Sequence, residues 1–579
     1  MQGQLLTQDF LQRGLTETAP WEALSDEHLG KFIDGMRKIY AGLNANSSIN
    51  EAQTEKVVIE KVLVELGWGD DYLPQVNLSG KRREDVPDVL LFPDTPSMTA
   101  AKAEARDDRR YRHGLAILEA KRWMRALDRG DDKDAAFDPG APSSQMLRYL
   151  SRAELASDRK VKWGILTNGA LWRLYWQDAR SRVEEFLEID VAALLDLEGI
   201  QRELDGYSTA HGLKLFFLLF HRAAFLPQTW TEAQGQTFHA YALGEARRYE
   251  ETVSQDLGAR VFDEIFPDLA NAIAKGDVQA RTVTVGYGSS KRQVPSPEYL
   301  QDVREAALVL LYRLLFLFYA EDRGLLPVRD ARYQPYSLRR IREEVRDKRD
   351  AGAPFSKTIA RIWGELAQTF FLIDEGDDSV GMPAYNGGLF DRRRSPVLVR
   401  TKVPDAVMAP LIDSLSRRQD VLKAWINYRD LSVSHLGGIY ERLLEYTLVV
   451  DTDNRDRVVA RPASFARKVS GSYYTHEDLV HLILRESVGR LADERLHAFQ
   501  SQTAKWRKKA SLNVGDLGVL DGLDPATQML ELKICDPAMG SGHFLVSLVD
   551  YMADRVLEAV NTAEHAVAEL PGSASMQEK

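Results

Sequence analysis

Two acidic residues and a lysine stand at the ends of two apolar runs of the chain, where they could act together on a phosphate ester. Asp88 opens one run, and Glu119 and Lys121 close another. Two carboxylates at adjacent strand ends can hold a magnesium ion, which prefers hard oxygen ligands. A lysine two positions after a carboxylate lies on the same face of a strand. There it can orient water or neutralise charge that develops on a phosphate during hydrolysis.

An aspartate and a Glu-x-Lys triplet also occur by chance, and a solvated strand end is the competing interpretation. The context favours a catalytic or metal-binding role for these residues, because the apolar run before Glu119 predicts a buried strand whose end emerges from the core. A helix is predicted at 51–66, with Asn50 as a possible N-cap. Three further features follow in order: Leu66-Gly67-Trp68 at the end of that helix, Gln145 and Tyr149 on one helix face, and Thr167-Asn168-Gly169 as a turn between strands.

With these features in this order, the first third of the chain resembles the PD-(D/E)XK nuclease superfamily. More narrowly it is similar to the nuclease domains of type I and type IIG restriction enzymes. The resemblance implies that Asp88 and Glu119 bind the metal and that Lys121 is catalytic. It further implies that Glu51 is an accessory acid and that Gln145 and Tyr149 help to position DNA.

A second group of residues favours a nucleotide-like cofactor. The apolar run at 530–535 predicts a buried strand, the sequence Asp536-Pro-Ala-Met-Gly-Ser-Gly-His-Phe544 predicts a tight turn, and a helix is expected at 542–560. Strand, glycine-rich turn and helix are typical of the start of a doubly wound sheet. Gly540 and Gly542 allow close approach of a ligand to the backbone. The phosphate-binding motifs GxGxxG and GKS/GKT are missing from this turn, which is compatible with S-adenosylmethionine (SAM), a cofactor without phosphate.

Upstream, Gly471-Ser-Tyr-Tyr-Thr475 precedes a helix expected at 476–491. Together the two segments resemble the γ-class N6-adenine DNA methyltransferases. The resemblance implies a SAM site lined by the following residues: Tyr474, Thr475, Asp536, Pro537, Ala538, Gly540, Gly542 and Phe544. The competing interpretation is a capped helix and an ordinary strand-to-helix turn.

Composition limits the class of protein. The chain has 579 residues, of which 44% are hydrophobic and 28% charged, as in globular proteins. One cysteine excludes an internal disulfide framework and a cysteine-only zinc site, and it favours the reducing cytoplasm, as does a start without a signal-peptide pattern. The apolar run at 307–318 contains Arg313 and is too short to span a bilayer. The net charge of −11 still allows a local cationic groove for double-stranded DNA.

The pattern of predicted strands and helices along the sequence indicates a multidomain α/β protein. We expect a PD-(D/E)XK nuclease-like α/β domain at 1–200, a helical connector without a catalytic site at 201–428, and the start of a Rossmann-like SAM-dependent methyltransferase domain at 429–579. Strands are predicted at 89–92, 115–118, 163–166 and 172–176, and helical spacing dominates the middle region.

The sequence departs from the methyltransferase family in one respect that matters for activity. It contains no Asn-Pro-Pro-Phe or Asn-Pro-Pro-Tyr loop, which in that family holds a flipped adenine. Nor is there an acidic strand end after 542–560 for the SAM ribose. We therefore expect a fragment, a shortened chain or one subunit of a split enzyme. Alone it would bind SAM weakly or not at all, and a second polypeptide or a missing C-terminal half would supply the adenine loop and target recognition.

Two functional hypotheses follow. The first is the N-terminal part of a bifunctional type IIG-like restriction–modification protein, an Mg2+-dependent endonuclease joined to a SAM-dependent adenine methyltransferase. The alternative is a methyltransferase component of a BREX- or DISARM-like phage-defence system, whose first domain binds DNA or a partner without cutting. The presence of Asp88, Glu119 and Lys121 favours the first hypothesis.

Overall fold

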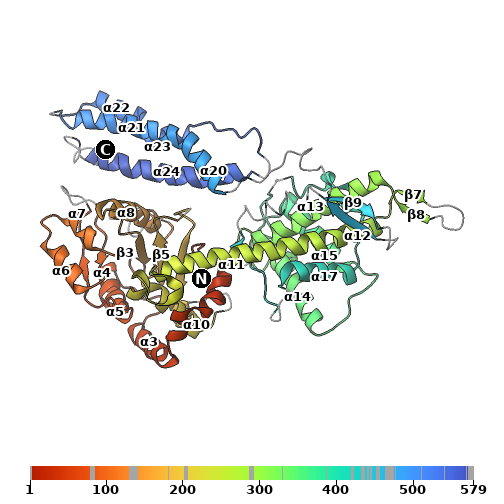
Figure 1. The fold of residues 1–579 in the computed structure, drawn as a ribbon, viewed down its shortest axis with the longest axis horizontal. Helices are drawn as coiled ribbons and strands as arrows, with labels where there is room; N and C mark the ends of the chain where they lie inside the picture. Colours follow the sequence, from red (N-terminus) through yellow and green to blue (C-terminus); the bar gives the residue numbers. More distant parts are fainter. Residues whose placement is uncertain are drawn as a thin grey trace. The chain divides into compact units, whose positions relative to one another are not determined.

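The computed structural model describes residues 3–78, 85–129, 141–179, 181–200, 207–285, 292–328, 330–385, 388–418, 423–431, 437, 439, 443, 446–451, 457–462, 475, 477–509, 511–539, 542–568 and 570. The chain divides into two compact units (Figure 1). The sheet unit comprises residues 1–249, 478–537 and 544–579, and the helical unit comprises residues 250–477 and 538–543. The mixed α/β architecture with several helical regions confirms the expected multidomain α/β class. The predicted boundaries at residues 200 and 428 stay a prediction.

A six-stranded sheet with the order β1-β2-β3-β4-β5-β6 forms the centre of the sheet unit. Its strands are β1 (Tyr72–Pro74), β2 (Val89–Leu91), β3 (Ala116–Ala120), β4 (Trp163–Thr167), β5 (Leu171–Trp176) and β6 (Phe186–Asp190). The β3–β4 pair is parallel and every other neighbouring pair is antiparallel. All four predicted strands are confirmed, as β2 to β5.

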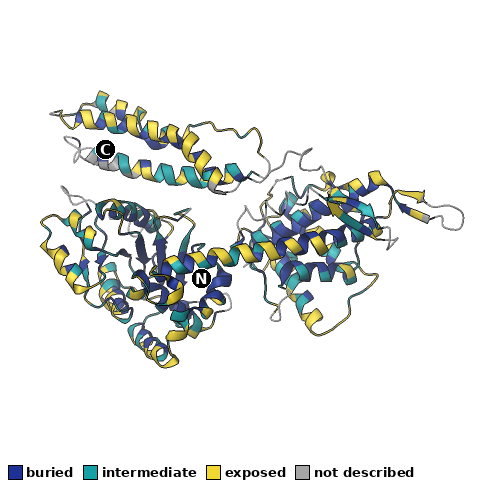
Figure 2. Cartoon of the chain, viewed as in Figure 1, coloured by how far each residue is buried: buried dark blue, intermediate teal, exposed yellow. Residues whose placement is uncertain are grey.

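The central strands are buried on both faces, as Figure 2 shows. Successive side chains of a strand point to opposite faces. Leu118 belongs to the core on one face, with Phe216 of helix α10 (Thr209–Phe220), whereas Ile117 belongs to the core on the other, with Met146 of helix α8 (Pro142–Ala156). Glu119 follows the parity of Ile117, so it faces the side that α8 covers.

Short helices surround the sheet. They are α1 (Gln8–Gln12), α2 (Ala19–Ala23), α3 (Asp26–Ile39), α4 (Glu51–Thr54), α5 (Glu60–Glu65), α6 (Thr95–Ala103), α7 (Asp107–Arg110), α8 (Pro142–Ala156), α9 (Val191–Leu194) and α10 (Thr209–Phe220). A π-helical turn at Glu55–Ile59 joins α4 to α5, which confirms the helix predicted at 51–66. Asn50 caps this helix in a reciprocal capping box with Gln53. After it, Trp68 is fully buried and its indole N–H donates to the Phe220 carbonyl at 3.1 Å.

The C-terminal helices of the sheet unit are α20 (Glu477–Leu484), α21 (Arg490–Trp506), α22 (Val514–Gly522), α23 (Pro525–Leu530) and α24 (His543–Ala568). The predicted strand at 530–535 is wrong. Leu530 ends α23, the residues after it form no strand, and the side chains of Leu530 and Ile534 are 73% and 38% exposed. A strand needs a neighbour for its backbone hydrogen bonds, and β10 is the last strand within the described residues.

The helical unit packs around α13 (Pro297–Asp322), a helix whose apolar side chains are largely buried (Figure 2). Its other helices are α12 (Phe266–Gly276), α14 (Leu338–Asp350), α15 (Arg361–Glu375), α16 (Pro396–Arg400) and α17 (Asp405–Ser416). Two hairpins complete it: β7 (Thr282–Val285) with β8 (Arg292–Pro295), and β9 (Tyr446–Val450) with β10 (Val458–Pro462). Helix α11 (Phe238–Arg260) belongs to the sheet unit up to Tyr249 and to the helical unit from Glu250.

Among the residues that the structure covers, no helix combines the length and the apolar character that crossing a membrane requires.

A buried histidine makes the sheet unit sensitive to acid. His239 of α11 lies between the rings of Trp163 and Phe225, with centroids 4.4 Å from each. Its Nε2–H donates to the Leu219 carbonyl at 2.7 Å, and the buried Nδ1 has no partner within the described structure. Burial lowers the pKa of His239 to about 4, because no group compensates a second ring proton.

We therefore expect the free energy of unfolding to fall as the pH drops from about 6.5 towards 4. The unfolded histidine takes up a proton in that range and the folded one does not. The loss from His239 alone is roughly 3 kcal/mol. Urea denaturation between pH 7.5 and 4.5 checks this. His239→Asn, which can still donate to the carbonyl, should start less stable but lose less with acid; an unchanged slope would contradict the assignment.

Candidate metal centre

Asp88 and Glu119 lie side by side because of the register between β2 and β3. Val89 pairs with Leu118, which sets Asp88 opposite Glu119. The Ala120 amide donates to Oδ2 of Asp88 at 2.7 Å, and the Asp88 amide donates to Oε2 of Glu119 at 3.3 Å. Each carboxylate is thus held by a main-chain amide of the neighbouring segment.

Lys121 forms a buried ion pair with Glu119. Its Nζ lies 2.8 Å from Oε1 of Glu119, and the two side chains are 3% and 4% exposed. Burial and the nearby negative charge of Asp88 together raise the pKa of Glu119 to about 8, against the opposing effect of Lys121. Lys121 thus favours the ionised form of Glu119, which burial and the charge of Asp88 disfavour.

Glu51 and Glu55 bring two more carboxylates to Asp88. One oxygen from each of these three residues lies within 4.8 Å of the other two. Burial, together with the negative charges of Asp88 and Glu51, raises the pKa of Glu55 to about 7. Glu55 was missed from the sequence, although it follows Glu51 by one helical turn and therefore shares its face.

The donor set fits a divalent cation. Three partly exposed carboxylates converge, and their repulsion is the situation that a bound cation relieves. Hard carboxylate oxygens are the ligands that Mg2+ and Mn2+ accept. Asp88 stands between the two groups, with Glu51 and Glu55 on one side and Glu119 on the other. A cation would therefore take Asp88 as the shared ligand, while Glu119 is also engaged by Lys121.

Gln145 and Tyr149 lie one turn apart on α8, and Nε2 of Gln145 donates to the Tyr149 hydroxyl at 3.0 Å. Burial raises the pKa of Tyr149, with a further contribution from the negative charge of Glu119. The hydroxyl is therefore close enough to feel the charge of the buried pair. Oε1 of Gln145 is buried without a partner in the described structure, so it can still accept a hydrogen bond.

The predicted Thr-Asn-Gly turn is confirmed, and it fixes the segment that follows Lys121. Oδ1 of Asn168 accepts from the amides of Ala170 and Leu171 at 3.0 and 2.7 Å, and Nδ2 donates to the Arg125 carbonyl at 2.7 Å. Gly169 has φ +81°, and a Cβ there would lie 3.0 Å from both Thr54 and Trp123. Only glycine fits this turn without strain.

Of the residues predicted to line a SAM site, Tyr474 and Gly540 lie outside the described residues. The others lie as follows: Thr475 and Asp536 are partly buried outside helices and strands, Pro537 and Ala538 are exposed in a turn, and Phe544 is partly buried in the first turn of α24.

Gly542 has the backbone freedom that the predicted turn requires. Its φ is +82°, a Cβ would meet nothing within 4 Å, and its amide donates to the Met539 carbonyl at 2.8 Å. The tight turn before α24 is therefore present, whereas the strand expected before it is not. Binding of SAM by these residues stays a prediction.

Comparison with known proteins gives one distant relative. No protein-family profile matches the chain, and no solved structure does. The chain is 24% identical over 268 residues to a protein of Methanocaldococcus jannaschii named "Putative type II restriction enzyme and methyltransferase". The match covers 42% of this chain and 20% of the relative, so the chain spans about a fifth of the length of the curated relative it matches. The chain is thus distantly homologous to a protein of restriction–modification type.

The geometry of the centre makes Glu55 testable as a metal ligand. Replacing Glu55 by Gln should weaken Mn2+ binding by roughly tenfold or more, because one anionic donor of a hard-cation site becomes neutral. Calorimetric titration of Mn2+ into the protein measures this. Glu22→Gln is the matched control, since Glu22 of α2 is an exposed glutamate that is not part of the cluster. Equal affinity of the two variants would remove Glu55 from the site.

Proposed function

We propose that this chain belongs to a restriction–modification protein and that residues 1–200, which contain the six-stranded sheet, form a PD-(D/E)XK nuclease domain that hydrolyses DNA phosphodiesters with Mg2+. The observation that carries the proposal is the placement of Asp88, Glu119 and Lys121 at the paired ends of β2 and β3. The distant relative, named as a restriction enzyme and methyltransferase, supports the same class.

The side chains of the centre divide the work of hydrolysis. A bound Mg2+ would supply Lewis acidity towards a phosphoryl oxygen and lower the pKa of a bound water. Asp88, with Glu51, Glu55 and Glu119, would hold that ion. Lys121, held beside Glu119, would bring its positive charge to the oxygens of the phosphate and so stabilise the negative charge that develops on them.

Gln145 and Tyr149 are proposed to position the DNA. The Tyr149 hydroxyl accepts from Gln145 and lies within electrostatic range of Glu119 and Lys121. A hydroxyl in this place can donate to a phosphate oxygen next to the scissile bond. Such contacts to the DNA backbone orient a strand without reading its sequence.

We further propose that the segment 429–579 contributes to a SAM-dependent N6-adenine methyltransferase of the Rossmann-like γ class. The Asp536–Phe544 motif, the turn at Gly542 and the name of the distant relative support this. SAM titrated into the wild-type protein and into Asp536→Ala tests the assignment: equal binding by both would contradict it.

Removing the lysine should abolish cleavage. Lys121→Ala is expected to lower the rate of Mg2+-dependent plasmid nicking by roughly a hundredfold or more, because a preorganised donor to the developing phosphate charge is lost. Glu119→Ala should lose metal binding as well, since it removes a carboxylate from a hard-cation site. Lys31→Ala, an exposed lysine on α3, is the control and should cut like the wild type.

Circular dichroism shows whether each variant is folded before its rate is compared. Nicking by folded Lys121→Ala at the wild-type rate would remove Lys121 from the mechanism. Wild-type protein that retains DNA but never nicks it in Mg2+ would favour the alternative, a phage-defence component whose first domain binds without cutting.

A further inference from the structure

The middle of α13 buries an arginine whose charge has no acidic partner. Arg313 is 4% exposed, and within the described part of the chain no carboxylate lies within ion-pair distance of it. The charges of Asp374 and Asp391 act on it only from a greater distance. Buried charges in proteins are usually paired or bind an ion, so this guanidinium marks a place where an anion can be accommodated.

The contacts of Arg313 leave part of its donor set unused. Nε donates to the Leu389 carbonyl at 2.8 Å and Nη2 to the Asp391 carbonyl at 3.2 Å. The guanidinium also packs against Phe370 and Phe390, 5.2 and 5.8 Å from the ring centroids. Two of its five N–H groups are thus assigned to backbone carbonyls, and neither contact neutralises the charge.

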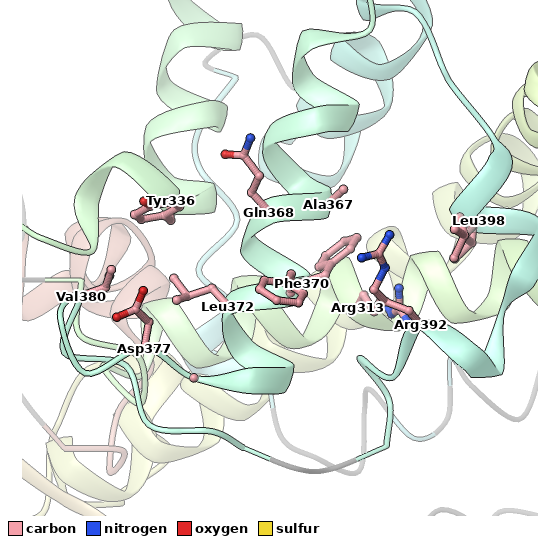
Figure 3. Close-up of a pocket in the computed structure, with 13 residues that line it drawn as sticks. Arg313, Tyr336, Ala367, Gln368, Phe370, Leu372, Asp377, Val380, Arg392 and Leu398 are labelled. Atoms are coloured by element: carbon pink, nitrogen blue, oxygen red, sulfur yellow. The ribbon is translucent and has the colours of Figure 1, made fainter.

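Arg313 lines a cavity of about 560 Å³ within the helical unit, a size typical of small-molecule sites. Figure 3 shows two chemically different ends. Arg313 and Arg392 lie beside Phe370 at one end, and Asp377 lies with Tyr336 at the other. Leu372 and Phe370 lie between the two ends (Figure 3), and the lining also includes Phe371, which is 49% exposed.

We propose that this cavity binds a mononucleotide, with its phosphate at the arginine end and its base against the aromatic wall. Two guanidinium groups favour phosphate, because the planar fork of arginine matches phosphate oxygens. The half-exposed ring of Phe371 among the lining residues offers a surface on which a base can stack. Asp377 is a hydrogen-bond acceptor for the amino group of a base at the opposite end. The site is independent of the metal centre and of the function proposed above.

The same chemistry could come from a free nucleotide or from one nucleotide of a strand. Calorimetric titrations with 5′-dAMP, adenosine and inorganic phosphate test the chemistry itself. We expect saturable binding of 5′-dAMP, and at least about tenfold weaker binding of adenosine and of phosphate, since each lacks half of the contacts. Competition of a short single-stranded oligonucleotide with 5′-dAMP then assigns the source to a strand, and its failure to compete assigns it to a free nucleotide.

Neighbouring arginines provide a matched pair of variants. Arg392 lines the cavity, whereas Arg393 is exposed and paired with Asp391. Arg392→Ala should weaken 5′-dAMP binding at least about tenfold, in line with the loss of a charge-assisted contact, and Arg393→Ala should not. Phe371→Ala should weaken 5′-dAMP and adenosine alike. Arg313→Lys keeps the charge and loses the fork, so it should also weaken binding.

Three results would overturn the proposal. They are the absence of saturable 5′-dAMP binding at millimolar concentration, adenosine binding as tightly as 5′-dAMP, and equal effects of Arg392→Ala and Arg393→Ala. Arg313 also donates to two backbone carbonyls, so Arg313→Lys could fail to fold. Arg392 is exposed, and Arg392→Ala therefore tests the proposal independently of that variant.

Discussion

The ion pair between Lys121 and Glu119 is the interaction on which the metal centre depends. Both side chains are almost completely buried, and a charge in such surroundings is costly unless an opposite charge compensates it. The pair can exist only because β3 ends where it does, with the amide of Lys121 held by the Thr167 carbonyl at 2.8 Å. The parallel strand β4 therefore supports the centre without contributing a ligand to it.

Sequence patterns correctly predicted the strands of the sheet unit that pair with another strand on each side. The apolar runs that became β2 to β5 each have paired strands on both sides, so local preference and tertiary pairing agree. Asp88 and Glu119 could be placed together because they stand at the ends of such runs. The run at 530–535 has a similar composition but lacks a paired neighbour among the described residues, and there the same reasoning gave a strand that does not form.

Two features of the molecule could not be predicted from the sequence. Glu55 belongs to the acidic cluster through helix geometry, and its importance depends on how close the helix comes to β2, which spacing along the chain does not contain. The cavity around Arg313 is lined by α13, by α15 and by residues within 376–380 and 392–399, and α13 is separated from the other lining segments by a long stretch of sequence. The apolar spacing in α13 correctly indicated a helix. It gave no reason to expect that Arg313 lines a cavity.

The turn at Asn168 and Gly169 limits which amino-acid substitutions this protein can accept. One buried amide side chain satisfies three backbone groups, two of which belong to the turn and one to the segment after Lys121. A replacement at Asn168 would leave all three unsatisfied at once. Partly exposed positions of α8 should therefore tolerate substitution better than this turn does. The turn is constrained by its hydrogen bonds, although it takes no part in the proposed chemistry.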